Sequence, residues 1–500
     1  MESLPPELIS RILVYIIDGR LRSHPGISLA PYATLSRRWQ AQIERCTFSY
    51  IYITTPRRLE EFERLLWTPR RRSCVRFIQL VVELESYDEK ARAHFETDEE
   101  RQRNDEIFTT TIGSLFKILS DWPANLDIGV DIKAQSPGDY LALKDPKERR
   151  QRKRAAAERV NDLLNKRYER SYLKFSRTTT ETECPVVPAV TGLSIWGAAK
   201  GRLIEPASSV FIASKLPRLN RVDLEMQDDC RRDEQLRQLL RSDFARNLDL
   251  FPGSVQRFGL RFFHAPPRNQ NYLPPDITED GVDILSSQLR TFSQRLERLE
   301  INDSVVGPEL FWPSTLPGDN LVNPPFWPLL IEVSVKYMEI TPSGEWLLDR
   351  DPGETPEDST DDFDATFGDE EDSYPEYVRI PLQDRKSKFF RTRIIAGHID
   401  RLYASAGRAA LRMPKLRWMT LQNVGPVHYS LEYEVQAGLS KLTWRNQDLT
   451  DGPYEPDALV RREKAKSLYQ PDEEVFEIWR NVAIQHTGRD VEIEFKEWGC

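Results

Sequence analysis

The chain has 500 residues, of which 39% are hydrophobic and 30% are charged, and its formal net charge is −9. This length allows roughly two to four ordinary domains, or one long repeat array joined to a small module, with enough apolar residues for a folded core. The five cysteines form no Cys-x-x-Cys pair, and there is no basic leader or apolar run of about 20 residues, so we expect no disulfides, signal peptide or transmembrane helix and a location in the cytoplasm or the nucleus.

A helical hairpin is expected in residues 1–47. Leu4 and Pro5 precede an apolar helical pattern, and proline fits a first helical turn because the N–H group that it lacks would be unpaired there. A polar turn follows, and a second pattern places Leu35 and Trp39 four residues apart. Helices this short cannot bury all their apolar faces on one another, so the surplus needs a partner.

This pattern resembles the F-box. In that family Leu-Pro-x-Glu-Leu opens the first helix and an apolar segment ending in Arg-Trp closes the motif, and here these parts are residues 4–8 and 35–39. The family's usual Leu-Pro-x-x-Asp connection is replaced by the longer segment 18–28. The resemblance implies that the hairpin binds the Skp adaptor of an SCF ubiquitin ligase and, through it, a cullin. The adaptor contacts that it implies are Leu4, Pro5, Leu8, Ile9, Ile12, Leu35 and Trp39.

Strand and helix patterns alternate through the rest of the chain. The first strand is expected at residues 48–53, which are rich in β-forming side chains, and an amphipathic helix follows Thr55 and Pro56. Further strands are expected at residues 75–82, 126–132, 193–196, 221–226, 256–263, 299–302, 332–337, 416–422 and 440–445. Further helices are expected at residues 106–120, 207–215, 232–247 and 282–294.

A proline-containing motif suggests that these units repeat. The pattern apolar-Pro-x-Leu-x-x-apolar-x-apolar occurs at residues 216–224, 327–335 and 413–421, where chance alone predicts fewer than about one match. The usual repeat asparagine is missing and the spacing is irregular. We therefore expect an α/β fold in which the helical F-box precedes an irregular leucine-rich-repeat-like solenoid, an arrangement that resembles filamentous-fungal F-box proteins. The alternative is an α/β domain without repeats.

Two charged segments are expected to be disordered insertions. Residues 144–177 hold thirteen Lys/Arg and five Asp/Glu, within a basic insertion at about 133–188. Residues 349–377 hold thirteen Asp/Glu and one Arg, within an acidic insertion at 343–378, and we expect that residues 351–373 can be deleted without loss of the fold. The expected domains are thus the hairpin at 1–47, an α/β region at 48–342, the acidic insertion, and a continuation of the α/β region at 379–500.

No catalytic or metal-binding constellation stands out. The six histidines are scattered, and the sequence contains neither a Gly-x-x-x-x-Gly-Lys-Ser/Thr loop nor a Gly-x-Ser-x-Gly elbow, so we expect no enzyme and no cofactor. The basic run at 147–154 is either a nuclear import signal or a solvated helix face, and the overall acidity argues against a dedicated nucleic-acid-binding protein. Residues 70–72, all arginine, either bind phosphate or lie in a solvated turn.

Two functions follow from these observations. In the first, the chain is the substrate-receptor subunit of an SCF-type ubiquitin ligase, which binds the adaptor through the hairpin and an unidentified target through the solenoid, and acts by proximity. In the second, the solenoid is an interaction scaffold unrelated to ubiquitination. There, Leu8, Ile12 and Trp39 pack on the first strand–helix unit as an N-terminal cap.

Overall fold

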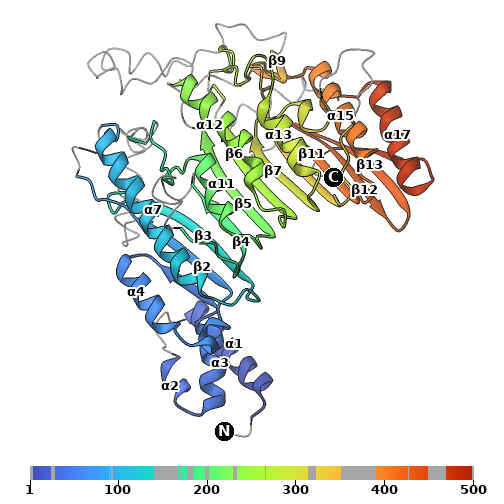
Figure 1. Ribbon diagram of the computed structural model, residues 1–500. Helices are drawn as coiled ribbons and strands as arrows, with labels where there is room; N and C mark the ends of the chain where they lie inside the picture. The colour runs from blue at the N-terminus through green and yellow to red at the C-terminus, as the bar shows by residue number, and fades with distance from the viewer. Residues whose placement is uncertain are drawn as a thin grey trace.

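One sheet organises the described part of the chain, and it confirms the α/β class. The computed structural model describes residues 4–23, 29–88, 91, 94–139, 167–168, 170–176, 184–197, 202–228, 233–264, 266–267, 269–313, 323–350, 390–425, 427–448 and 469–497. Among these residues twelve strands form a mixed, mostly parallel sheet in the order β1-β2-β3-β4-β5-β6-β7-β8-β11-β12-β13-β14 (Figure 1). Two further strands, β9 and β10, form a separate antiparallel pair.

The elements have the following bounds. The strands are β1 Tyr50–Ile53, β2 Phe77–Glu83, β3 Ile128–Gln135, β4 Val190–Trp196, β5 Arg221–Asp228, β6 Arg257–His264, β7 Arg298–Ser304, β8 Glu332–Met338, β9 Leu348–Arg350, β10 Arg391–Ile394, β11 Trp418–Val424, β12 Val427–Gln436, β13 Leu439–Asp448 and β14 Glu492–Glu497. The helices are α1 Pro6–Ser23, α2 Ala30–Ala33, α3 Arg37–Thr47, α4 Pro56–Leu65, α5 Pro69–Arg72, α7 Asp98–Ser120, α11 Pro206–Ser214, α12 Glu234–Arg246, α13 Ile284–Ser293, α15 Ala396–Ala410 and α17 Glu473–Thr487, with single 3-10 turns η2 Leu248–Leu250 and η3 Pro308–Leu310.

The helices that connect the strands cover one face of the sheet (Figure 1). Strands β1 to β8, and β8 with β11, pair in parallel and in chain order. Crossovers between parallel strands are almost always right-handed, so successive crossovers in one direction place every helix on the same side. The strands alternate accordingly: in β6, Phe258, Leu260 and Phe262 are buried, whereas Arg257 and Arg261 are exposed. Among the described residues, the connecting helices therefore leave the opposite face of the sheet uncovered, and we call it the open face.

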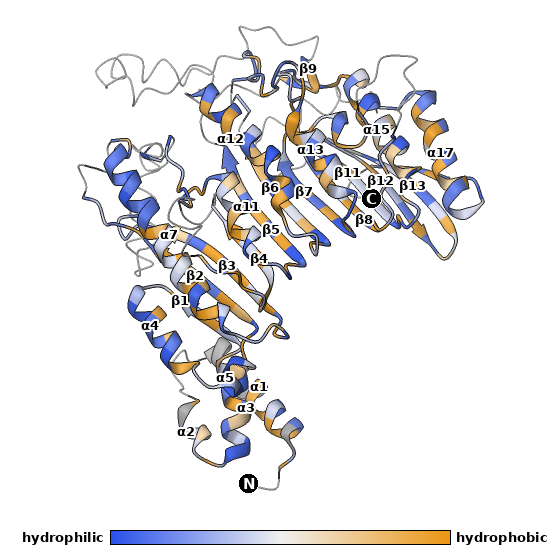
Figure 2. Ribbon diagram, in the orientation of Figure 1, coloured by the Kyte–Doolittle hydropathy of each residue, from blue (hydrophilic) through white to orange (hydrophobic). Residues whose placement is uncertain are grey.

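The hydrophobic core is continuous along the sheet. One cluster of buried side chains extends from Ile53, in β1, to Val491, just before β14. It therefore joins the two regions expected at 48–342 and 379–500. Figure 2 shows how α7 contributes: its N-terminal half is hydrophilic and its C-terminal half is hydrophobic. Phe108, Ile112 and Leu115, from the hydrophobic half, are fully buried.

The proline-containing motif marks the entry to three strands. It leads into β5, β8 and β11, and its leucines, Leu219, Leu330 and Leu416, are at most 3% exposed. The Leu219 N–H donates to the Leu216 carbonyl at 3.0 Å, and the Leu416 N–H donates to the Met413 carbonyl at the same distance. This turn directs the leucine into the core before the strand begins, as the motif predicts.

The C-terminal part departs from simple alternation. Strands β11, β12 and β13 pair antiparallel, and β14 then pairs parallel to β13. A two-residue turn joins β12 to β13, with Ala437 and Gly438 at positive φ (53° and 77°). Our sequence analysis did not predict β12, because Asn-Gly or Asp-Gly is the usual signal for such a turn and alanine replaces the first residue here. It also did not predict α15, α17 and β14.

Parts of both expected insertions belong to the fold. Strand β3 continues to Gln135, and Leu173 and Phe175 are buried after residue 167. Trp346 is buried and β9 follows it, inside the segment expected to be an acidic insertion. Residues 140–166 and 351–389, which include the basic run at 147–154 and the stretch 351–373, lie outside the described residues, so the disorder expected there stays a prediction.

Candidate functional site

The three N-terminal helices form a module with its own core. Ile9 and Leu13 of α1 pack with Trp39 and Ile43 of α3, and this cluster is separate from the core of the sheet. Figure 1 shows the module at the end of the molecule, beyond β1 and α4. The Ser36 hydroxyl caps α3 by accepting a hydrogen bond from the Trp39 N–H at 3.3 Å. The expected helical hairpin is thus present.

The seven expected adaptor contacts divide into two groups. Leu8, Ile12 and Leu35 are 44%, 38% and 44% exposed, and Pro5 is also exposed. In contrast, Ile9 and Trp39 are buried inside the hairpin at 0% and 4%, and Leu4 packs partly against the same cluster. Ile9 and Trp39 can therefore support a binding surface but cannot contribute much of it.

The structure adds a residue that the sequence analysis did not single out. Tyr15 is 79% exposed and follows Leu8 and Ile12 on α1 at helical spacing (i, i+4, i+7), so the three share one helix face. We call these three residues of α1 the hairpin stripe; Leu35 is exposed on the segment between α2 and α3. The helical spacing of the three stripe residues is visible in the sequence, but periodicity alone does not tell which of the two apolar faces of α1 packs into the core.

Arginines 70–72 join the hairpin to the sheet. The Arg71 guanidinium lies 3.1 Å from a Glu44 carboxylate oxygen in α3 and stacks over the Phe48 ring, 5.3 Å from its centroid. Arg70 approaches the other Glu44 oxygen at 3.6 Å, and Arg72 donates to the Leu66 carbonyl at 2.8 Å. These arginines therefore contact protein groups where the hairpin meets the rest of the fold. The sequence analysis considered only a phosphate site or a solvated turn for them.

The open face of the sheet is polar. Asp131 accepts a hydrogen bond from Gln79 at 3.0 Å across β2 and β3. Farther along the sheet, Arg261 pairs with Asp303 at 2.6 Å and Lys441 with Glu494 at 2.8 Å. A face of this kind suits a polar or charged partner better than an apolar one.

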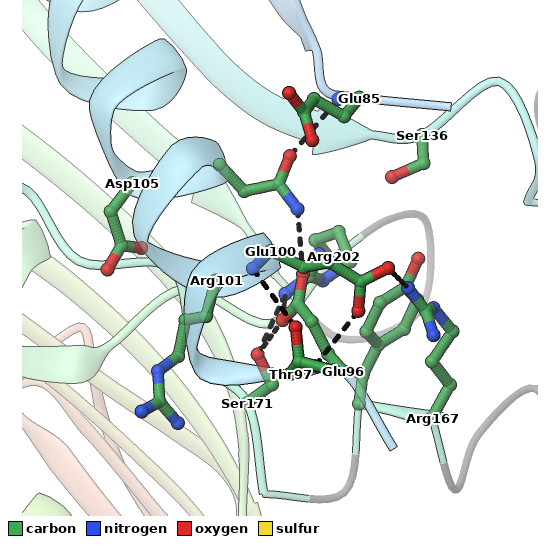
Figure 3. Close-up of polar contacts among 12 residues, drawn as sticks. Glu85, Glu96, Thr97, Glu100, Arg101, Asp105, Ser136, Arg167, Ser171 and Arg202 are labelled. Carbon is green, nitrogen blue, oxygen red and sulfur yellow. Dashed lines mark hydrogen bonds and ion pairs between the residues drawn. The ribbon is translucent and has the colours of Figure 1, made fainter. Parts of the chain in front are cut away.

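A buried polar network lies at the N-terminal end of α7 (Figure 3). Arg202 and Glu96 form a bidentate pair at 2.6 and 2.9 Å, and their side chains are only 0% and 1% exposed. Ser171 bonds to both partners, and Asn104 donates to Glu96 at 2.7 Å. Breaking such a pair leaves an uncompensated buried charge, so we interpret this network as a structural lock on the preceding loop.

Arg167 extends the lock. It pairs with Glu100 at 2.8 Å, and Glu100 in turn completes a capping box with Thr97 at the start of α7 (Figure 3). Burial opposes the ionisation of Glu100, but the Thr97 N–H and the Arg167 guanidinium outweigh it and hold the pKa of Glu100 below its usual value. The carboxylate therefore stays charged at neutral pH and anchors the helix.

A second buried network lies at the carboxyl ends of β5 and β6. Asp228 lies 2.6 Å from Arg237 and 2.7 Å from His264 Nδ1, and all three side chains are buried. Burial opposes the charge on Asp228, but His264 and Arg237 hold its pKa below the usual value, whereas burial lowers the pKa of His264. An ionised Asp228 accepting from a neutral imidazole explains both directions. His264 thus serves packing at the carboxyl ends of the strands.

A cavity between α7 and α11 offers no catalytic pairing among its lining residues. It has a volume of about 560 Å³ and lies between α7 and the start of α11, with Asp105, Glu205 and Lys174 among its lining residues. Burial raises the pKa of Asp105 to about 6, although the Lys174 N–H donates to it at 2.8 Å. The lining contains no histidine or cysteine. Within the described ranges, no group of three or more His, Cys, Asp or Glu side chains is placed to hold a metal ion.

Comparison with known proteins identifies only part of the chain. Residues 386–498 match a family of unknown function (DUF6546), which covers α15, α17 and the strands β10 to β14. No F-box or leucine-rich-repeat family is detected, and neither the curated proteins nor the solved structures contain a match. No helix in the described part of the chain is both long and apolar enough to cross a membrane.

Proposed function

We propose that this protein is a substrate-receptor subunit of an SCF-type ubiquitin ligase. In this proposal the hairpin binds the Skp adaptor, which connects it to a cullin, and the sheet holds a target protein. The observation that carries the proposal is the hairpin stripe on a module whose core is separate from that of the sheet. Exposed apolar side chains that share one helix face often mark a protein-binding site.

The sheet supports the second half of the proposal. Its parallel strands follow one another in chain order with the connecting helices on one face, and this order supports the proposed leucine-rich-repeat-like solenoid. Such an array leaves the other face open for a partner. In this proposal the chain positions a target near a ubiquitin-loaded enzyme. Such a role acts through proximity and needs no chemistry from the chain itself.

The cap alternative fits the contacts less well. A cap would cover Leu8 and Ile12 with the first strand–helix unit, but both side chains are exposed, and Trp39 packs within the hairpin. A scaffold unrelated to ubiquitination would also leave the hairpin stripe without a role. These contacts favour an external partner for the hairpin.

Co-purification with the Skp adaptor tests the proposal. We expect the full chain to retain the adaptor, and the double variant Leu8→Ser/Ile12→Ser to lose it without a lower melting temperature, since both side chains are exposed. Val14→Ser is the matched control, because Val14 is 53% exposed and lies roughly a third of a turn away from the stripe on α1. Failure of the wild-type chain to retain the adaptor would refute the proposal, as would equal retention by the double variant.

A further inference from the structure

A continuous row of paired residues crosses the open face near the amino ends of the strands. Strand register sets the order Phe77, Gly129, Gly192, Arg221, Arg257, Arg298, Glu332 and Trp418, each residue directly beside the next. The row thus brings together two glycines and three arginines that are far apart in the sequence. We call it the cross-strand row.

The three arginines lie side by side in this row, and their side chains are exposed. Neighbouring strands lie about 4.8 Å apart, so the backbone positions of Arg221 and Arg298 are roughly 10 Å apart with Arg257 between them. Arg221 pairs with Asp223 at 2.7 Å, and Arg298 pairs with Glu332 at 3.0 Å. Arg257 forms no ion pair with the described residues. Asp223 and Glu332 thus balance the two outer arginines, and the guanidinium of Arg257 is left to bind an external anion.

The glycines make a depression next to these arginines. A Cβ atom at Gly129 would lie 2.8 Å from the Phe77 ring, which shows that the ring leans over that position. A Cβ atom at Gly192 would instead meet only the Gly129 Cα, at 3.5 Å, among the described residues. The Phe77 ring is itself stacked on Tyr50, 5.2 Å between centroids. The space above Gly192 therefore has an aromatic wall on one side and Arg221 on the other.

We propose that the cross-strand row binds an extended acidic segment of the target protein, with its carboxylates over Arg257 and its neighbours and an apolar side chain seated above Gly192 against Phe77. Identifying this segment as part of a target rests on the function proposed above. An extended chain advances about 3.3 Å per residue, so three or four acidic residues span the arginines and the apolar residue follows one or two positions later.

The charge pattern supports an acidic partner of this kind. Guanidinium groups bind carboxylates through paired N–H donors, which gives orientation as well as attraction. Each exposed ion pair contributes little by itself, so we expect the affinity to come from several contacts and to weaken with added salt. The apolar side chain above Gly192 adds a contact that salt does not screen, and it fixes the position of the segment along the row.

Direct binding of a synthetic peptide to the full chain tests this proposal. The probe is a fluorescent peptide with a run of glutamates followed by a leucine in a glycine/serine context, and its control has glutamines in place of the glutamates. We expect Arg257→Glu to weaken binding of the glutamate peptide by about tenfold or more. Arg64→Glu, the same charge change on an exposed residue of α4, should leave the affinity unchanged.

A second variant separates loss of binding from loss of folding. Gly192→Val fills the depression with a side chain that strands favour over glycine, so the melting temperature should not fall while binding weakens. Equal binding of the two peptides, equal effects of Arg257→Glu and Arg64→Glu, or tighter binding of a single-stranded oligonucleotide at Arg257 would overturn the inference. Adaptor retention, measured on the same variants, should be unchanged. A wild-type chain that retains the adaptor but does not bind the glutamate peptide would thus refute the cross-strand row, whereas absence of adaptor retention in the wild type refutes the proposed function.

Discussion

Glu339 is a buried carboxyl group that follows β8. Its side chain is 5% exposed, and Oε2 has no hydrogen-bond partner among the described residues. Burial raises its pKa to about 7, although the charge of Arg391 partly offsets this effect. The folded state therefore holds a proton that the unfolded state releases near pH 4.5, and the stability of the fold decreases as pH rises from about 4.5 to about 7.

Glu339→Gln should remove this pH dependence. Near pH 5 the variant and the wild type should melt at similar temperatures, because the wild-type carboxyl is then neutral in the fold. Above pH 8 the variant should be more stable by about 3 kcal/mol, since it no longer ionises a buried group. Melting curves from pH 5 to pH 9 measure this difference, and parallel curves for the two proteins would contradict it.

The hairpin shows how far the sequence predicted the role of each residue in the candidate adaptor site. Its apolar pattern marked Leu8 and Ile12 of the hairpin stripe but not Tyr15. It could not separate Leu8 and Ile12, which are exposed, from Ile9 and Trp39, which are buried. Helical periodicity gives neighbours on a helix surface, but the inward face depends on how α1 and α3 pack, and that is a tertiary property.

At the scale of elements, the proline-containing motif carries a clear energetic expectation. Leu219→Ala removes a fully buried side chain at the entry to β5 and should cost about 3 kcal/mol, because the surrounding core cannot close the cavity fully. Leu239→Ala is the matched control, since Leu239 on α12 is 53% exposed and its loss should cost less than about 0.5 kcal/mol. Denaturant unfolding measures both. Similar costs for the two variants would mean that the motif leucine does not anchor the strand.

The elements that the sequence predicted are those with a strong local pattern. Strands β5 to β8 have buried residues at every second position, and the helices between them have an apolar stripe. Helix α15 was not predicted although Ile399, Leu402 and Tyr403 give its first half an apolar stripe; its second half packs through small residues such as Ala406 and Gly407. At Gly407 a Cβ atom would lie 2.4 Å from Ile478 of α17, so close helix packing replaces the usual signal.

At the scale of the whole molecule, the segment 351–389 begins and ends at neighbouring positions of the fold. Arg350 of β9 pairs with Arg391 of β10, so the two ends of the segment 351–389 are neighbours in an antiparallel pair. We predict that a short glycine/serine turn can replace this segment with a change in melting temperature of no more than about a few degrees. Calorimetry checks this, with the intact chain as reference. Loss of cooperative melting would show that the fold depends on the replaced residues.

The arrangement across the sheet could not be read from the sequence. The residues of the cross-strand row come from different strand–helix units with irregular spacing, and their adjacency depends on the register of each strand pair. A shift of one residue in any pair would turn the side chains to the other face. Strand positions were predictable, whereas the surface that they form together required the three-dimensional structure.

The central claim is that the hairpin is a docking module for the Skp adaptor, independent of the sheet. Hydrogen exchange of the full chain, with and without the purified adaptor, tests it most directly. We predict protection of the amides of α1 and of the segment around Leu35, with little change in β4 to β8. Protection confined to the sheet, or none at adaptor concentrations that saturate other F-box proteins, would contradict this account.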